Sequence, residues 1–389
     1  MKYKLSEIAL FNPTETIKKG TLAKKIGMDK LQSFCRDIPD YEIAEFTGGT
    51  KFRNGDTIMA RITPCLENGK TAKVNLLDDG EIGFGSTEYI VYRAIDGITD
   101  EDYLYYLVCS PFVRDIAIKS MVGSSGRQRV QTDVVKNIEI DLPSLDDQRK
   151  IGALLKSLDD KIAVNNVINE NLEQQAQAYF QELFIENADP NWKAGTISDL
   201  GTVVGGSTPS KSKPEYYCEN GIAWITPKDL SVNKSKFVSR GENDITELGL
   251  KNSSASIMPE GTVLFSSRAP IGYIAIAAGE VTTNQGFKSV VPKPEIGTAF
   301  VYFFLKQNLP VIEGMASGST FKEVSGSTMK NIPATVPDAD TISKFNDFCT
   351  PIFAQQRILE EQNQSLTELR NSLLPKLMAG EINLAEIQF

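Results

Sequence analysis

The sequence contains no histidine, so a chain of 389 residues lacks the most common general base and the most common metal ligand. Catalytic arrangements of the Ser-His-Asp or Cys-His kind are therefore excluded. An enzyme would have to use carboxylates, lysine or residues of a partner. No cofactor-binding loop is evident either, so a self-contained enzyme is the least favoured interpretation.

Cysteine and long apolar runs are also scarce. The five cysteines are widely spaced and form no CxxC pair, which predicts free thiols in a reducing compartment rather than a zinc site or a disulfide framework. No apolar run approaches the ~18 residues of a membrane span. The opening stretch MKYKLSEIALFNP lacks the apolar core of a signal peptide. We expect a cytoplasmic protein with no membrane partner.

Acidic residues are unevenly distributed along the chain. The net charge is −9, but residues 145–187 and 338–389 each hold four basic and eight acidic side chains. Each of these segments therefore carries −4, and the rest of the chain carries −1. Because the position of charge matters more than its sum, a basic surface outside the two segments is permitted.

The chain reads as two similar halves. VKNIEIDLP at 135–143 aligns with MKNIPATVP at 329–337, DYLYYL at 102–107 resembles FVYFFL at 300–305, and LSEIA at 5–9 resembles ISDLG at 197–201. The matches occur in the same order in both halves. The number of residues that separates matching segments varies in the middle of the repeat and is constant at its end. This predicts one fold in both halves, with loops of different length.

The first part of each half has the pattern of short strands bounded by turns. We expect strands within 55–62 and 84–93, and within 261–268 and 285–293. A short amphipathic helix is expected near 101–119 and near 298–314. Trp224 is interpreted as a core residue rather than a platform on which a base stacks.

The second part of each half has the pattern of one long helix. Apolar residues recur at steps of three and four from Ile151 to Leu183 and from Phe345 to Leu377. Pro351 and Pro375 are expected to kink or shorten the second helix. The helices either pair as a coiled coil or each pack on their own domain. Polar residues that interrupt both stripes either fix register in the seam or form a solvated face: Asn165, Asn166, Asn169, Gln362 and Asn363.

These patterns predict an α+β fold with two pseudo-symmetric β-rich domains separated by two long antiparallel helices that form a coiled-coil rod. The domains span 1–143 and 188–337, the central helix 144–187 and the distal helix 338–389. Two similar domains at a fixed separation suit duplex DNA that carries two half-sites, with the helices acting as a ruler.

Over essentially its full length the chain resembles the specificity (S) subunit of type I restriction-modification systems. Motifs similar to that family's occur in both halves, in family order. They are FGSTEYIVYR at 84–93, LPSLDDQRKIGALLKSLDDKI at 142–162, GGSTPSKSKPEYYCENGIAWITPKDL at 205–230, SSRAPIGYIAI at 266–276, TTNQGFKSV at 282–290 and LRNSLLPKLMAGEI at 369–382.

The resemblance implies that each β-rich domain is a target recognition domain that reads one half of a split, asymmetric DNA site. The helices would fix the spacer and dock two methyltransferase (M) subunits, which bind S-adenosylmethionine and methylate adenine. Motor-nuclease (R) subunits, which use ATP and Mg, would complete the restriction enzyme. The chain itself would have no cofactor and no catalytic residues.

Two alternatives stay open. The chain could serve a modification-only methyltransferase without a nuclease. It could instead be a coiled-coil scaffold whose globular domains bind proteins, in which case it would show no salt-dependent affinity for DNA.

Readout of DNA needs Arg or Lys for guanine, Asn or Gln for adenine, and acceptors or hydroxyls elsewhere. In the first domain we select Arg61, Thr63, Ser86, Thr87, Glu88, Arg127, Gln128 and Arg129. In the second we select Lys211, Lys213, Lys228, Ser266, Ser267, Arg268, Asn284, Gln285, Lys288, Thr320 and Lys322. The alternative is that these residues belong to exposed loops, or to strand ends and turns that satisfy backbone groups.

The run Asp159-Asp160-Lys161 resembles part of a nuclease carboxylate–lysine set. Because it lies on the long helix between Leu158 and Ile162, we interpret it as a solvated helix face.

Overall fold

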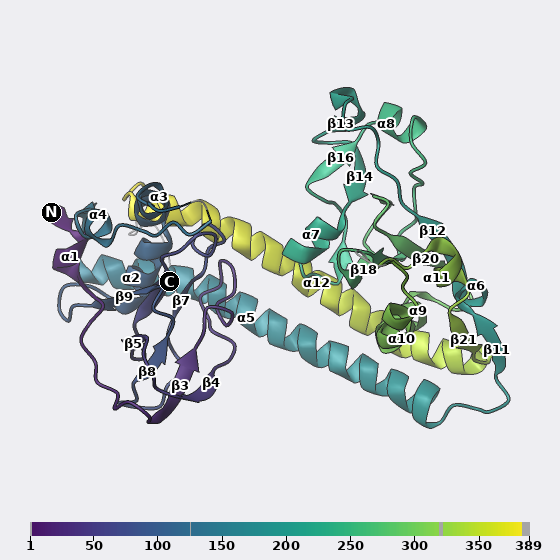
Figure 1. Cartoon of the computed structure of the whole chain (residues 1–389), viewed down its shortest axis with the longest axis horizontal. Coiled ribbons are helices and arrows are strands. Elements are labelled where there is room, and N and C mark those ends of the chain that lie inside the picture. The colour runs from purple at the N-terminus through teal and green to yellow at the C-terminus, as the bar shows by residue number, and fades with distance from the viewer. Residues whose placement is uncertain (1, 125, 319–321, 383–389) are drawn as a thin grey trace. The chain divides into compact units, whose positions relative to one another are not determined.

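Two long helices organise the chain. The structure, a computed structural model, describes residues 2–124, 126–318 and 322–382 (Figure 1). Helix α5 spans Leu145–Gln181 and continues into a π-helical turn, η1, at Glu182–Glu186; α12 spans Ala339–Met378. The chain divides into two compact units, Met1–Val164 with Asn363–Phe389, and Asn165–Gln362. Each unit therefore contains one β-rich domain and part of both long helices.

The described residues of the first β-rich domain form short strands and four short helices. Its elements are β1 Lys2–Lys4, α1 Leu5–Ile8, β2 Ala9–Phe11, β3 Leu22–Ile26, β4 Glu42–Glu45, β5 Thr50–Phe52, β6 Thr57–Ala60, β7 Thr71–Lys73, β8 Gly83–Gly85, β9 Tyr89–Ala94, α2 Glu101–Cys109, α3 Pro111–Lys119, α4 Thr132–Lys136 and β10 Glu139–Asp141. The helix predicted near 101–119 is present but is broken before Pro111, which has no amide hydrogen to continue α2.

The second β-rich domain begins and ends with the same kinds of element as the first and has additional short helices between them. Its elements are β11 Lys193–Thr196, α6 Ile197–Leu200, β12 Gly201–Gly205, η2 Pro214–Tyr216, β13 Tyr217–Cys218, β14 Ile222–Ile225, α7 Pro227–Val232, β15 Phe237–Val238, β16 Asn243–Ile245, α8 Glu247–Lys251, β17 Val263–Ser267, β18 Ile271–Ala277, β19 Thr282–Thr283, β20 Lys288–Pro292, α9 Thr298–Gln307, α10 Leu309–Gly314, α11 Gly326–Lys330 and β21 Pro333–Val336. Trp224 on β14 is buried, as predicted.

The sheets repeat from one domain to the other. The first domain has sheets in the orders β2-β9-β6-β7, β4-β3-β8-β5 and β1-β10. The second has β12-β20-β17-β18-β15, β13-β16-β14-β19 and β11-β21. Strands β6 and β17 are thus equivalent centres of the main sheet, and a parallel pair (β3 with β8, β14 with β19) recurs in the other sheet. The internal repeat read from the sequence is a repeat of topology.

Both long helices begin directly after a proline and a capping residue. Ser144 Oγ accepts from the amide of Asp147 at 3.2 Å, and Asp338 Oδ1 accepts from the amide of Thr341 at 2.9 Å. Such side chains satisfy amides of the first turn that have no partner within the helix. The hydrogen bonds from Thr341 and from Trp192 lower the pKa of Asp338 to about 2.

The two helices are antiparallel. In the second unit, Gln356 Nε2 donates to the carbonyl of Asn169 at 3.0 Å, and the rings of Tyr179 and Phe348 lie 4.7 Å apart, so rising numbers in α5 meet falling numbers in α12. Asn165 is fully buried and donates to Gln362 at 3.5 Å. The buried interpretation therefore holds for Asn165, whereas its neighbour Asn166 is exposed.

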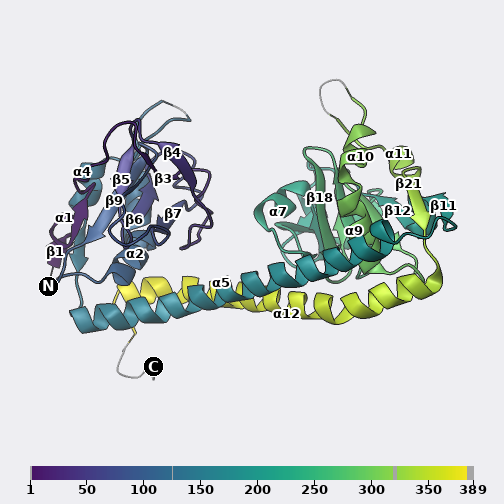
Figure 2. The ribbon, with the colours of Figure 1, turned by 90° about the horizontal axis from the view of Figure 1, so that it is seen from below.

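Each domain packs an aromatic helix against the helix pair, so pairing and packing on the domain occur together. Figure 2 shows α2 and α9 lying over the long helices within their own units. In the first unit Tyr103 of α2 joins a buried cluster with Ile151 of α5 and Leu377 of α12. In the second unit Phe300 of α9 and Phe345 of α12 form part of the equivalent cluster. Each such side chain contributes ~1.5–3 kcal/mol by its burial.

Pro351 and Pro375 are predicted to kink or shorten the second helix, and the shortening is wrong. Helix α12 is continuous through Pro351 and Pro375. Each proline removes one backbone hydrogen bond, but Ile352 and Leu377, one and two residues after the two prolines, are buried, and such tertiary packing outweighs the local loss. The helix ends at Met378, and Gly380 follows it with a φ of +70°.

The end of α12 is a Schellman motif. The amide of Gly380 donates to the carbonyl of Leu377 at 3.2 Å, and the amide of Glu381 donates to the carbonyl of Lys376 at 2.9 Å. Glycine is favoured at this position because the left-handed conformation is unfavourable for residues with a Cβ atom.

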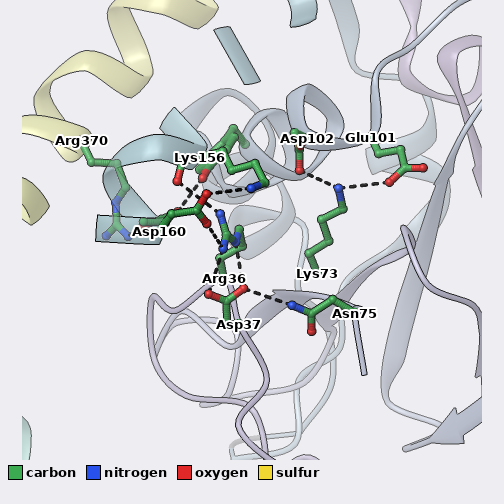
Figure 3. Close-up of polar contacts among 11 residues, drawn as sticks. Arg36, Asp37, Lys73, Asn75, Glu101, Asp102, Lys156, Asp160 and Arg370 are labelled. Carbon is green, nitrogen blue, oxygen red and sulfur yellow. Dashed lines mark hydrogen bonds and ion pairs between the residues drawn. The ribbon is translucent and has the colours of Figure 1, made fainter. Parts of the chain in front are cut away.

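The interpretation of residues 159–161 as a solvated face is wrong for Asp159. Its side chain is 6% exposed and forms an ion pair with Arg370 of α12 at 2.5 Å. Asp160 is half-buried and binds Lys156 and Arg36 (Figure 3). The predicted fold class is confirmed: an α+β chain with two β-rich domains of one topology and two long antiparallel helices.

Candidate nucleic-acid interface

Three separate stretches of the first domain meet where β6 ends. The amide of Arg61 donates to the carbonyl of Glu88 at 2.8 Å, that of Thr63 to Gln128 at 3.0 Å, and that of Val130 to Arg61 at 2.9 Å. We call this meeting point, residues 61–63, 86–88 and 127–130, the first corner. The structure thus brings together the candidates selected separately from these stretches.

The first corner carries one strong ion pair. Arg129 Nη2 lies 2.6 Å from Glu88 Oε1, and Arg129 Nε donates to both carboxylate oxygens at 2.9 Å. This hydrogen bond from Arg129 lowers the pKa of Glu88. Arg129 remains 46% exposed and Glu88 23% exposed, so the pair presents donors and an acceptor to solvent together.

The other candidates of the first corner differ in accessibility. Thr87 and Arg127 are exposed, whereas Arg61 is half-buried and donates to the carbonyl of Val130 at 3.3 Å. Ser86 Oγ accepts from the amide of Glu88 at 3.1 Å and so shapes the turn before β9. The exposed Thr87 and Arg127 flank the ion pair on two different loops.

The second domain has an equivalent corner. The amide of Ser267 donates to the carbonyl of Gly286 at 2.7 Å, and that of Val324 donates to Ser267 at 3.0 Å. These bonds repeat those of the first corner, so Ser267, Gly286 and Val324 are equivalent to Arg61, Glu88 and Val130. We call residues 266–268, 284–288 and 322–324 the second corner.

The equivalent positions carry opposite charges. The isolated bridge of Arg268 with Glu323 repeats that of Ile62 with Arg129. Glu323 is therefore equivalent to Arg129. It lies 3.3 Å from Arg268 and 3.5 Å from Lys288, neither of which is equivalent to Glu88. The two corners share a backbone but not a pattern of donors and acceptors.

Several second-domain candidates satisfy the structure itself. Ser266 and Ser267 are fully buried, and their hydroxyls donate to the carbonyls of Pro270 at 2.8 Å and Gly286 at 3.1 Å. Asn284 Oδ1 accepts from the amide of Gly286 at 2.8 Å. These three side chains therefore bind backbone groups at strand ends and turns, as in the alternative to DNA contact given above.

The remaining candidates lie on exposed side chains. Gln285 is exposed and its Oε1 accepts from the hydroxyl of Thr208. Lys213 pairs with Glu215 at 3.6 Å and Lys228 with Glu242 at 2.6 Å. Lys211 and Lys322 are exposed, and Thr320 lies outside the described residues.

The corners face away from the helix pair within each unit. Figure 2 shows that the described chain on either side of residue 125, and on either side of residues 319–321, lies on the side of its own domain opposite the long helices. Sequence reasoning missed Glu323, because its partners Arg268 and Lys288 come from distant stretches. The one signal in the sequence was that Glu323 directly precedes the apolar Val324, which is buried and so fixes the backbone at this point.

Other kinds of site were also sought. In the described part of the chain, no group of three or more histidine, cysteine, aspartate or glutamate side chains is arranged to hold a metal ion. All five cysteines are free, and burial raises the pKa of the Cys109 and Cys349 thiols to about 12. None of the described helices is long and apolar enough to cross a membrane.

Comparison with known proteins gives a consistent family. The sequence model of the type I restriction modification DNA specificity domain matches residues 1–174 and 190–371. The chain is 40% identical over 191 residues to the specificity subunit of the type I restriction enzyme MjaIX of Methanocaldococcus jannaschii, covering 47% of this chain and 44% of that protein. It is 24% identical over 408 residues to the HindI specificity subunit of Haemophilus influenzae, covering 85% and 87%.

A solved structure shares the fold. The S subunit of a type I restriction-modification system from M. genitalium superposes with a TM-score of 0.59 at 15% identity, over 97% of this chain and 95% of that one. The sequence alignment thus covers less than half of the MjaIX specificity subunit. The structural superposition covers nearly all of the M. genitalium S subunit.

Proposed function

The chain belongs to the family of type I restriction modification DNA specificity domains, and from this premise we propose that it is the DNA sequence-specificity subunit of a type I restriction-modification complex. Each β-rich domain reads one half of a bipartite site in double-stranded DNA. The long helices set the gap between the two half-sites.

The observation that carries this proposal is the pair of equivalent corners with different side chains. Arg129 and Glu323 occupy the same backbone position and carry opposite charges. A scaffold that used both domains for one partner would have no need for opposite charges there. Two readers of an asymmetric site need a shared frame and different reading groups.

The groups in the first corner suit a G·C pair. Arginine donates to O6 and N7 of guanine, and a glutamate accepts from the N4 amino group of cytosine. Arg129 and Glu88 offer both functions within hydrogen-bonding distance of one another. In the second corner Arg268, Lys288 and Gln285 supply donors and an amide, so the half-site read there differs.

The chemistry resides in partner subunits under this proposal. Two methyltransferase subunits would bring S-adenosylmethionine, and motor-nuclease subunits would bring ATP and Mg. Docking on the long helices is supported by exposed apolar side chains that neither β-rich domain covers. They include Val164 at 52%, Val167 at 60%, Ile358 at 47% and Leu369 at 45% exposure.

A methylome tests the proposal. The chain is co-expressed with the methyltransferase subunit of the same system, and methylated adenines are mapped by single-molecule sequencing. We expect a bipartite motif with one fixed gap that disappears when this chain is omitted. No new methylation from an assembled complex supplied with cofactor would contradict the proposal.

The scaffold alternative gives a different result in a binding assay. DNA affinity of the assembled complex should fall steeply as salt rises, because lysine and arginine contacts release counterions from phosphates. A scaffold would show no such dependence.

The ruler is tested by lengthening it. One helical turn inserted into both α5 and α12 adds ~5.4 Å to each. We expect a longer gap with both half-sites retained. Loss of one half-site with the gap unchanged would show that the helices do not set the spacing.

A further inference from the structure

Two buried basic side chains occupy equivalent backbone positions in the two β-rich domains. The carbonyl of Arg36 accepts from the amide of Lys73 on β7 at 2.9 Å, and the carbonyl of Lys236 accepts from the amide of Ile276 on β18 at 2.7 Å. Strands β7 and β18 are the equivalent antiparallel neighbours of β6 and β17: Lys73 lies opposite Thr57, and Ile276 lies opposite Val263. Arg36 and Lys236 are each 8% exposed. Both side chains reach a long helix.

Arg36 connects the first domain to α5 (Figure 3). Its Nη2 lies 2.6 Å from Asp160 Oδ1, and its Nη1 donates to the carbonyl of Lys156 at 3.4 Å. Asp37 holds the guanidinium from the domain side, 2.9 Å from Nε. Lys156 also pairs with Asp160 at 2.7 Å, which fixes the carboxylate. The guanidinium can make these bonds in only one orientation.

Lys236 connects the second domain to both long helices. Its Nζ lies 2.7 Å from Glu173 of α5 and donates to Gln356 of α12 at 2.9 Å. The ring of Phe353 lies 3.5 Å from Nζ. The Lys236 amide also donates to Glu360 Oε1 of α12, at 2.7 Å. Backbone and side chain of one residue are thus both bound to the helices.

Glu173 is the centre of a wider network. It also pairs with Lys306 at 2.5 Å and accepts from the hydroxyl of Tyr302 at 3.1 Å, both on α9. Burial alone would raise the pKa of Glu173, but Lys236 and Lys306 lower it. The network therefore joins α9, the segment before β15 and both long helices around one charged carboxylate.

These contacts differ in kind from the apolar packing around them. Apolar packing is non-directional and tolerates small rotations with little loss of buried area. A buried, hydrogen-bonded charge has one good geometry, and its best-attested use is to fix register. We propose that Arg36 and Lys236 are positioning residues that fix the orientation of each target recognition domain on the helix pair, so that the gap between half-sites depends on these two side chains as well as on helix length.

The inference deepens the proposed function and rests on it. Each corner lies on the side of its domain away from the helices (Figure 2), so a tilt at the helix contact moves the corner further than the contact itself. Successive base pairs rise only ~3.4 Å along the axis of duplex DNA. A small loss of orientation is therefore enough to accept a gap one base pair shorter or longer.

The test is the methylome of the assembled complex with Lys236→Met, which keeps an unbranched chain but removes the charge. We expect both half-sites to be retained and methylation at gaps one base pair shorter or longer to rise at least tenfold relative to the original gap. Lys234→Met is the matched control: Lys234 is exposed and donates to the carbonyl of Leu230 within the domain. It should leave the gap unchanged. Lys236→Arg, which restores a cation, should recover most of the preference for one gap.

A merely structural role for Lys236 would lower methylation at all sites and leave the gap distribution unchanged, which would overturn the inference. If Lys236→Met yields no methylation at all, Glu360→Gln decides. This change removes the charge of Glu360 from the contact with Lys236 but keeps an oxygen that accepts from the Lys236 amide. Methylation at only the original gap in that variant would also overturn the inference. A wild-type chain without any bipartite motif would instead refute the proposed function itself.

Discussion

Replacing Asp159 by alanine is expected to lower the free energy of unfolding of the first unit by ~3–5 kcal/mol, because the change leaves a buried arginine without its carboxylate. Asp159 is 6% exposed and Arg370 is 11% exposed. Arg370 Nη1 lies 2.5 Å from Asp159 Oδ1, and the Tyr106 hydroxyl donates to Oδ2 at 2.6 Å. The substitution breaks both contacts.

The magnitude distinguishes this pair from a surface pair. An exposed ion pair contributes ~0–1 kcal/mol, and a hydrogen bond from a neutral hydroxyl contributes ~1 kcal/mol. Arg370 keeps a weaker bond to Asn371 at 3.2 Å, which favours the lower end of the expected range. The double variant Asp159→Ala/Arg370→Met removes both charges and should be more stable than Asp159→Ala alone.

Urea unfolding of the full chain measures these differences. Circular dichroism follows both units, whereas the two tryptophans, Trp192 and Trp224, report only on the second unit, residues 165–362. Asp159→Ala should shift the circular dichroism transition more than the tryptophan transition. Lys161→Ala, an exposed position on the same helix, serves as the control.

Two results would refute this reasoning. A change below ~1 kcal/mol for Asp159→Ala would show that the pair behaves like an exposed one. A double variant less stable than Asp159→Ala would show that the uncompensated charge on Arg370 is not the cause.

Three further outcomes follow from the same structure. Gly380→Ala should destabilise the chain by ~1 kcal/mol in urea, because the site has space for a methyl group but requires positive φ. Burial lowers the pKa of Lys236 to about 8. Since the unfolded lysine keeps its proton to higher pH, the unfolding free energy should rise between about pH 8 and 10.5, and Lys236→Met should lack this increment in pH-dependent denaturation. Arg127→Ala should weaken DNA binding by ~1–3 kcal/mol if Arg127 contacts a base edge, with Lys136→Ala on α4 as control; unchanged affinity and unchanged site preference would exclude Arg127 from the interface.

The sequence by itself determined the architecture. Periodicities of three and four residues, a proline before each long helix and an ordered set of repeated motifs are local signals, so they predicted two β-rich domains and two long helices. Helix starts such as Ser144 and Asp338 also depend on neighbours within four residues. The predictions that proved wrong concerned side chains that pack against residues distant in the sequence. Pro351 and Pro375 did not shorten α12, because packing on either side outweighed a local preference.

Only the tertiary structure decided which candidate residues act together. Arg129 and Glu88 are 41 residues apart in sequence, and Arg268 and Glu323 are 55 apart, yet each pair shares one corner. Asp159 is charged and lies on a helix, which predicted solvent exposure; its burial depends on Arg370, 211 residues away. Equivalence between corners likewise rests on hydrogen bonds between strands and loops, whose spacing varies between the two halves. Burial and ion pairing of charged groups are set by the distant residues that surround them, and a single sequence does not encode those neighbours in any local pattern.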